Sequence, residues 1–262
     1  MAESKAKSTD GTPSAERKFP TEIIDLPSGG KLYPEGHPCK NGKIEVKYMT
    51  AKEEDILTSQ NLIKKGVVID KLLESLILTE GVKIDDLILG DKNAVMIASR
   101  ILAYGPEYTV EIENKYTGDK FDHTFNLTDC PFKVLPEDID YSKGEFDFKL
   151  PTAKINVKIQ LLTGSKEKQI EAEVKRTAKY GSSSEITSRL RHIIVEIDGN
   201  REQDDINEFV QNMLSRDSLA LREYLTTITP DIELKQEVDM EGELVEVDIP
   251  LTANFFWPTS SR

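Results

Sequence analysis

The stretch that decides the fold is Leu26-Pro27-Ser28-Gly29-Gly30-Lys31-Leu32-Tyr33-Pro34, near the start of a chain of 262 residues. Its first half is a turn cluster, because proline presets φ and two adjacent glycines permit positive φ and a close approach of two backbones. A phosphate-cradling loop is not indicated, since no Gly-Lys-Ser/Thr follows and the loop does not lead straight into a helix. The stretch therefore predicts an ordered turn near the point where the folded chain begins.

The composition limits the classes of protein that the chain can represent. Its length is enough for one large domain or two small ones with a real core. The net charge of −13 disfavours binding to nucleic acid or to an anionic membrane, because phosphate groups would be repelled. No segment approaches the roughly 20 apolar residues of a membrane span, and no apolar stretch near Met1 predicts a signal peptide. We expect synthesis in a reducing cytosol.

The first half of the chain reads as mainly helical. Residues 1–20 are polar and lack hydrophobic periodicity, which predicts a disordered tail. Residues 21–130 are expected to form an N-terminal helical domain with a β-hairpin. Thr50 and Glu53 have the spacing of a capping box, and Asp91 is placed to cap a later helix. Between them lies a helical apolar stripe formed by Ile69, Leu72, Leu73, Leu76 and Ile77.

The period of the apolar residues changes after Glu107. They alternate in two runs on either side of Thr117-Gly118-Asp119, which predicts the β-hairpin. Pro- and Gly-containing residues 131–144 read as a linker, and residues 145–262 as a C-terminal domain of mixed antiparallel strands and helices. Leu190 to Ile197 predicts a strand within it. The fold class is therefore α+β.

The sequence offers no catalytic, metal or cofactor site. Cys39 and Cys130 are too far apart for a C-x-x-C pair, and a disulfide between them stays open. The histidines are isolated, so none has a partner at metal-ligand spacing. The acidic residues that follow Thr50 stand at a helix start, where the helix dipole favours negative charge without any chemistry.

Several phrases in a fixed order resemble a known family. They are Leu26-Pro27-Ser28-Gly29-Gly30 with Tyr33-Pro34, Met49-Thr50-Ala51-Lys52-Glu53-Glu54 with Ile56-Leu57-Thr58-Ser59, Gly90-Asp91 with Arg100 and Tyr104-Gly105-Pro106-Glu107-Tyr108, Leu161-Leu162-Thr163-Gly164, and Phe255-Phe256-Trp257-Pro258. Together they are similar to the baseplate hub and hub-assembly proteins of T-even-type contractile-tail bacteriophages. The resemblance covers most of residues 23–258.

The chain departs from this family at one turn. Relatives often carry Cys-x-x-Cys-Gly where this chain has Asn114-Lys115-Tyr116-Thr117-Gly118, a degenerate zinc-ribbon-like turn. Without thiolates a zinc ribbon cannot form. We therefore expect a metal-free hairpin held by packing of Tyr108, Phe121 and Phe125.

The resemblance implies a non-enzymatic baseplate hub subunit or hub-assembly factor that binds other hub or tail proteins. It would be present in the host cytoplasm during assembly and in the virion baseplate if it stays, with no nucleic acid, membrane insertion or cofactor. Aromatic and apolar anchors dominate protein interfaces. The candidate partner contacts are Leu26, Pro27, Leu32, Tyr33, Phe255, Phe256 and Trp257. The alternatives are a peptidoglycan-cutting hydrolase of the baseplate and a generic transient scaffolding protein. The oligomeric state stays open.

Overall fold

The computed structural model describes residues 19–179, 184–251 and 255–257 and shows a mixed α+β fold, as the sequence predicts. The expected tail, residues 1–20, lies outside the described residues except for Phe19 and Pro20. The helices are α1 (Ala51–Thr58), α2 (Gln60–Lys65), α3 (Val68–Leu76), α4 (Leu89–Tyr104), α5 (Gly164–Ala178), α6 (Glu185–Ile193), α7 (Gln203–Gln211) and α8 (Ser215–Ile228). Short 3₁₀ turns occupy Ile84–Asp86, Leu127–Asp129 and Tyr141–Lys143.

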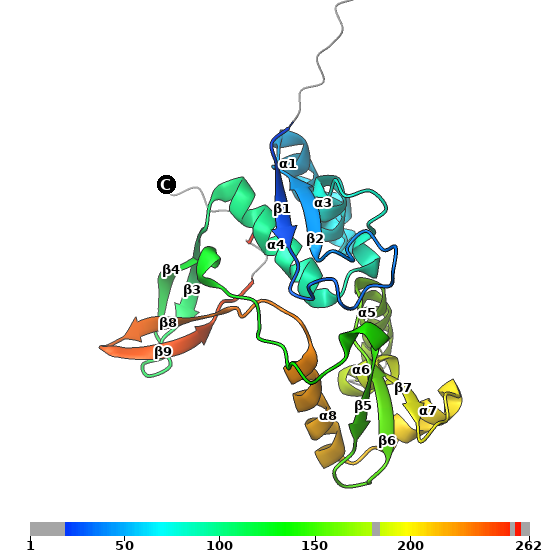
Figure 1. The fold of residues 1–262 in the computed structure, drawn as a ribbon. Helices are drawn as coiled ribbons and strands as arrows, with labels where there is room; N and C mark the ends of the chain where they lie inside the picture. Colours follow the sequence, from blue (N-terminus) through cyan, green and yellow to red (C-terminus); the bar gives the residue numbers. More distant parts are fainter. Residues whose placement is uncertain (1–18, 180–183, 252–254, 258–262) are drawn as a thin grey trace, which may run out of the picture.

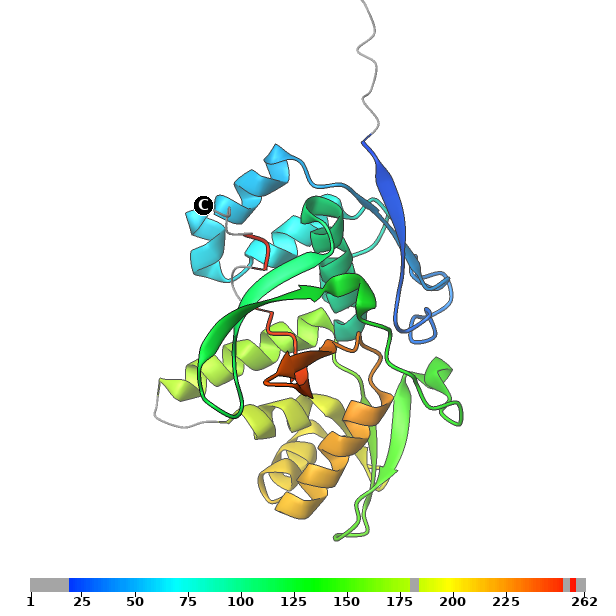
Figure 2. The ribbon, with the colours of Figure 1, turned by 90° about the vertical axis from the view of Figure 1, so that its left-hand side faces the viewer.

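The strands form small antiparallel sheets in the described part of the chain. They are β1 (Thr21–Asp25), β2 (Lys43–Lys47), β3 (Glu107–Glu113), β4 (Lys120–Asn126), β5 (Glu145–Lys149), β6 (Asn156–Gln160), β7 (Ile194–Ile197), β8 (Lys235–Met240) and β9 (Glu243–Asp248). The pairs are β1–β2, β3–β4 and β8–β9, and β6 lies between β5 and β7. Helices α1 to α4 gather at one end of the molecule and α5 to α8 at the other (Figures 1 and 2).

Two hydrophobic cores meet along helices α3 and α4. Leu73 and Val95 belong to the core that extends into β5, β6 and helices α6 to α8. Leu72 and Ile97 face the other core, which the two hairpins β3–β4 and β8–β9 help to build. Each helix buries residues on two sides because its apolar positions spread beyond one stripe. Helix α4 therefore lies in the middle of the fold, as Figure 1 shows.

Residues on both sides of the predicted 131–144 linker share a core. Phe125 of β4 and Val238 of β8 are buried in the same cluster. The backbone of Lys133 donates to the carbonyl of Asp231 at 2.9 Å, so the linker is itself hydrogen-bonded to a later segment. The division into domains at this linker stays a prediction, and cutting the chain there would expose this shared core.

Three local predictions are confirmed here, and one predicted strand is partly wrong. The capping box is present, with the Thr50 N–H donating to Glu53 at 3.0 Å. The hairpin forms with Tyr108 opposite Phe125. Gly29 and Gly30 have φ of +57° and +76°, and a Cβ on Gly30 would lie 2.3 Å from the Lys40 carbonyl oxygen, so the expected close backbone approach occurs. The strand over Leu190 to Ile197 is wrong in its first half, because the residues up to Ile193 complete helix α6.

Candidate functional site

The opening loop is bound to the first turn of α4 by a buried carboxylate. Asp91 accepts hydrogen bonds from the Ser28 N–H (2.9 Å), the Ser28 hydroxyl (2.6 Å) and the Tyr33 hydroxyl (2.7 Å). The Tyr33 oxygen in turn accepts from the Ile88 N–H at 3.2 Å. The prediction that Asp91 caps α4 is wrong: Ile88 is the cap, and Asp91 is the third residue of the helix. Its carboxylate serves the loop instead of its own helix end.

Burial determines the protonation of this cluster. Desolvation raises the pKa of Asp91 above its ordinary value, although the hydrogen bonds from Ser28 and Tyr33 oppose the rise. Desolvation and the neighbouring Asp91 also raise the pKa of Tyr33. The cluster is fully hydrogen-bonded and closed to solvent, so its arrangement stabilises the loop and presents no acid or base to a substrate.

The terminal aromatic phrase is bound to the other end of α4. Arg100, only 3% exposed, donates to the carbonyl oxygens of Phe255 (2.8 Å), Gly105 (2.9 Å) and Glu107 (3.1 Å). The Phe255 ring meets Tyr108 edge-on, with centroids 5.1 Å apart. The guanidinium thus compensates the loss of water by binding three carbonyls, although burial lowers its pKa.

The Leu161-Leu162-Thr163-Gly164 phrase joins the start of α4 as well. The Leu89 N–H donates to the Leu162 carbonyl at 3.3 Å, and the Gly164 N–H donates to the Leu87 carbonyl at 3.0 Å. A Cβ on Gly164 would approach the Ile84 carbonyl oxygen to 3.0 Å, so glycine permits this contact. Three phrases that are far apart in the sequence therefore meet along one helix. We call this meeting place the α4 junction.

The α4 junction contains most of the predicted partner contacts in its interior. Leu26, Pro27, Tyr33, Phe255 and Phe256 are buried, and their side chains pack inside the described chain. The half-buried members of the set are Leu32 and Trp257. Of this set, Leu32 and Trp257 present part of a side chain to solvent in this conformation.

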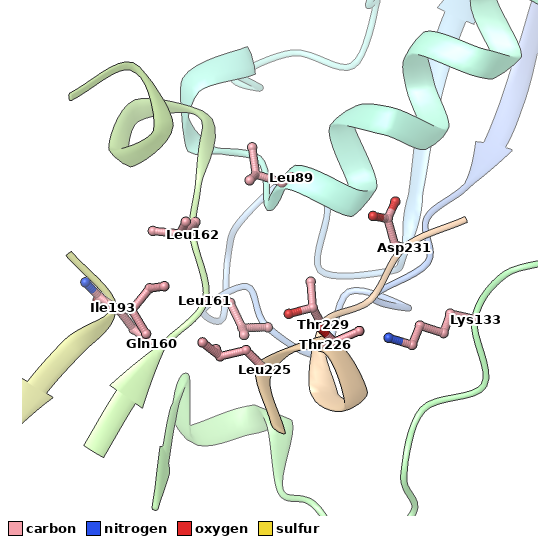
Figure 3. A pocket seen from close by; sticks show the side chains of 10 residues that line it. All are labelled: Leu89, Lys133, Gln160, Leu161, Leu162, Ile193, Leu225, Thr226, Thr229 and Asp231. Atoms are coloured by element: carbon pink, nitrogen blue, oxygen red, sulfur yellow. The ribbon is translucent and has the colours of Figure 1, made fainter. Parts of the chain in front are cut away.

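A small pocket opens beside the α4 junction (Figure 3). It has a volume of about 280 Å³, and its walls are mainly apolar. Figure 3 shows Lys133 and Asp231 on one side of it and the leucines of the 161–164 phrase on the other. The residues that line it are Leu89, Lys133, Gln160, Leu161, Leu162, Ile193, Leu225, Thr226, Thr229 and Asp231. Such walls suit an apolar side chain and contain no nucleophile–base pair.

An ion network ties the two ends of the molecule together. Asp70 of α3 accepts from Lys92 of α4 at 2.6 Å and from Lys168 of α5 at 2.7 Å. Lys168 also pairs with Asp85. Burial alone would raise the pKa of Asp70, but its hydrogen bonds to the two lysines lower it overall. The network holds α5 against the helices of the first half.

The other deeply buried carboxylates are also engaged in structure. Glu53 accepts from Lys47 (2.8 Å) and Ser75 (2.7 Å), and Asp217 accepts from the N–H groups of Thr152 and Ala153.

Within residues 19–179, 184–251 and 255–257, no group of three or more His, Cys, Asp or Glu side chains could hold a metal ion. Over the same ranges no helix is long and apolar enough to cross a membrane.

The hairpin turn that departs from the zinc-ribbon pattern is held by hydrogen bonds. Asn114 Oδ1 accepts from the N–H groups of Tyr116 (2.8 Å) and Thr117 (3.3 Å). Thr117 Oγ1 accepts from the Asp119 N–H at 3.2 Å, and Gly118 has φ of +76°. The two residues that stand in place of thiolates therefore cap the turn with their side chains.

Sequence reasoning missed the roles of Asp91 and Arg100. Both belong to the quoted phrases, but their partners lie 63 and 155 positions away, and no local pattern signals such pairs. It also missed the exposed apolar side chains Ile23, Val134 and Leu244. The sequence alone does not show which face of a strand or loop packs against the core, so these three side chains carry no signal of exposure.

One comparison with known proteins gives a match. A family model described as T4 bacteriophage base plate protein matches residues 19–257. No match was found among curated proteins or among solved structures. The matched range begins and ends with the described residues and includes every element of the fold.

Proposed function

Because the chain belongs to the T4 bacteriophage base plate protein family, we propose that it works in the central hub of the baseplate as a non-enzymatic protein. It is either a permanent hub subunit or a factor that acts while the hub is assembled. Its mechanism is binding to other hub or tail proteins, in the host cytoplasm during assembly and in the virion if it stays. Family membership supports the baseplate; the hub role rests on the resemblance of the quoted phrases.

Open strand edges that bear exposed apolar side chains carry this proposal. Strand β1 pairs with β2 on one side, and no described strand pairs with its other side. Ile23 in β1 is 62% exposed, and Leu244 in β9 is 69% exposed. Unpaired edges of this kind attract strands of other chains, and monomeric proteins usually protect them. A subunit of a larger assembly has partners to cover them.

The state of the carboxylates supports binding over hydrolysis. A peptidoglycan-cutting enzyme needs a pair of carboxylic groups facing a cleft. Here Glu53, Asp91 and Asp217 are each fully buried and bound to structural donors. Glu53 holds a helix start in place, Asp91 holds the opening loop and Asp217 holds a turn.

Within the predicted contact set, Leu32 and Trp257 are the proposed surface members. Both are half-buried and stand beside side chains that the α4 junction fixes in place, such as Tyr33 and Phe256. The buried members would then act by holding Leu32 and Trp257 in position. Rigid support of this kind lowers the entropy cost of binding.

Mass spectrometry of purified, intact virions tests the proposal. A fixed, low copy number of this chain per particle, with cross-links to baseplate neighbours, indicates a permanent subunit. Absence from virions together with cross-links to hub precursors in infected cells indicates an assembly factor. A chain that contacts no tail protein in either sample contradicts the proposal.

A paired substitution tests the strand edge. Phage that carry Ile23→Glu should assemble fewer baseplates, because a charge would enter a buried contact. The matched control is Ile186→Glu in helix α6, where the isoleucine is 49% exposed but lies on no strand edge. Equal assembly by the two variants would contradict a role for β1.

A separate assay tests the enzyme alternative. Lysis of cell-wall material by the purified protein, lost on changing one carboxylate, would show that the chain is an enzyme.

A further inference from the structure

A polar pocket of about 570 Å³ opens between α5, α6, β7 and α7. Its charged lining residues come from separate elements: Lys166 and Glu173 from α5, Arg191 and His192 from α6, and Arg201 from the segment before α7. Amide side chains and the buried Ile194 and Ile206 complete the wall.

Two of these side chains already have partners. Glu173 lies 3.1 Å from His192 Nε2, and Arg201 is held by Glu145 (2.7 Å) and Glu196 (2.8 Å). Because both oxygens of Glu145 accept from Arg201, this guanidinium already has the bidentate carboxylate that suits its geometry. Arg201 therefore has no free charge to offer a ligand, whereas Glu173 keeps its negative charge in the lining whenever His192 is neutral.

Lys166 and Arg191 differ, because neither forms an ion pair with any residue in the described ranges. Both are half-buried. Arg191 uses Nε on the Thr187 carbonyl (3.2 Å) and Nη2 on the Ser188 hydroxyl (3.4 Å), which leaves its Nη1 donors for another acceptor. The chain as a whole has a net charge of −13. These two cationic side chains without ion-pair partners therefore form a locally positive region in an acidic protein.

This arrangement suits a carboxylate on a polypeptide. A guanidinium presents parallel N–H groups that match the two oxygens of a carboxylate, and an ammonium adds a point charge. Partial burial strengthens such contacts relative to bulk water. The wall of isoleucine and amide side chains can contact the backbone and the aliphatic part of a peptide side chain. A free inorganic anion would make no such contacts.

We propose that this pocket binds an acidic peptide segment of a partner protein, with a Glu or Asp carboxylate seated between Arg191 and Lys166. The identity of the partner as a baseplate protein rests on the function proposed above. The affinity for an acidic peptide is independent of that function, because it is measured on the isolated chain. The long-range repulsion between the acidic chain and the peptide is screened within about 8 Å at physiological salt, which leaves the local attraction.

Fluorescence anisotropy with labelled hexaglutamate tests the pocket, with hexaglutamine as the neutral probe. The full chain should bind hexaglutamate at physiological salt and bind hexaglutamine at least about tenfold more weakly. Arg191→Gln and Lys166→Gln should each weaken hexaglutamate binding about tenfold. The matched control is Arg176→Gln, which removes one exposed charge from α5 outside the pocket and should leave affinity unchanged. Glu173→Gln should strengthen binding, since it removes the acidic group of the lining.

Three results would overturn the proposal that this pocket binds an acidic peptide. The first is binding that Arg176→Gln weakens as much as the pocket variants do. The second is equal binding of the two peptides. The third is displacement of hexaglutamate by inorganic phosphate at equal concentration, which would identify a site for free anions. Lys166 makes no side-chain hydrogen bond in the described chain, so Lys166→Gln should keep the fold and isolates binding from stability. Virion content is unaffected by these outcomes and tests the hub role separately.

Discussion

The Nε–H group of Arg100 donates a hydrogen bond of 2.8 Å to the main-chain carbonyl oxygen of Phe255. This contact joins the middle of the chain to its last described residues and lies inside the protein. It explains why an arginine and a terminal aromatic phrase occur in one sequence pattern: the first supplies the donors that the second needs once water has been excluded.

Arg100→Met should lower the free energy of unfolding by about 1–3 kcal/mol, because it leaves the buried Phe255 carbonyl without its donor, while the part-buried carbonyls of Gly105 and Glu107 also lose theirs. Urea unfolding followed by circular dichroism measures it. Arg176→Met, at an exposed site on α5, is the control and should change stability by less than about 0.5 kcal/mol. Equal losses in the two variants would show that the carbonyl contacts contribute nothing.

Tyr33→Phe should destabilise the chain by about 1–3 kcal/mol, since it removes a donor from Asp91 and the acceptor of the Ile88 N–H. Tyr116→Phe removes a similar tyrosine–carboxylate hydrogen bond, to Glu243 at 2.8 Å, from an exposed turn. We expect that control to cost less than about 0.5 kcal/mol, because water replaces the lost partner. The comparison of the two urea midpoints separates the effect of burial from that of the hydrogen bond itself.

Gly90→Ala should reverse the usual sign of a glycine-to-alanine change in a helix. In an open helix the change stabilises by about 1 kcal/mol. Here the added Cβ would lie 1.8 Å from the Pro230 carbonyl oxygen, so the segment after α8 must move away from α4. We expect a loss of about 1–3 kcal/mol or more in unfolding free energy. A more stable variant would mean that this segment does not rest on α4.

Gly164→Ala gives the graded comparison for that experiment. Its Cβ would meet the nearest atom, the Ile84 carbonyl oxygen, at 3.0 Å, which a small shift can relieve. Its cost should therefore be smaller than that of Gly90→Ala. The opposite order would contradict the distances at these two sites.

The lowered pKa of the Glu53 carboxyl predicts a loss of folding stability in acid. Burial alone would raise its pKa, but hydrogen bonds from Lys47, Thr50 and Ser75 lower it from 4.5 to about 2. Between these values the unfolded chain binds more protons than the folded chain, so stability is complete above the unfolded pKa and falls as the pH drops through the window. The full effect is roughly 3 kcal/mol.

Glu53→Gln should flatten this part of the pH profile. Unfolding free energies measured from about pH 5 down to about pH 3 should fall less steeply in the variant than in the parent chain. Asp55→Asn, an exposed carboxylate-to-amide change in the same helix, is the control. If both variants keep the parent slope, the acid sensitivity originates elsewhere.

Local elements were predictable where the chain's own neighbours decide them. The Thr50–Glu53 capping box depends on residues three apart, and the β3–β4 hairpin depends on alternation around one turn. The strand over Leu190 to Ile197 failed in its first half because a short apolar run fits a helix end as well as a strand. Sequence position also does not separate buried from exposed aromatic side chains: Phe256 and Trp257 are neighbours in sequence, and only Phe256 is fully buried.

By itself the sequence determined the α+β class, the helix that starts after Thr50, the helix of the 69–77 stripe, the hairpin and the family phrases, because periodicity, capping and turn chemistry act over a few residues. Only the tertiary structure decided what those phrases do. Asp91 met Ser28 and Tyr33, and Arg100 met Phe255, once the chain had folded along α4. Buried polar groups must find partners wherever the fold brings them, and sequence distance places no limit on where those partners are.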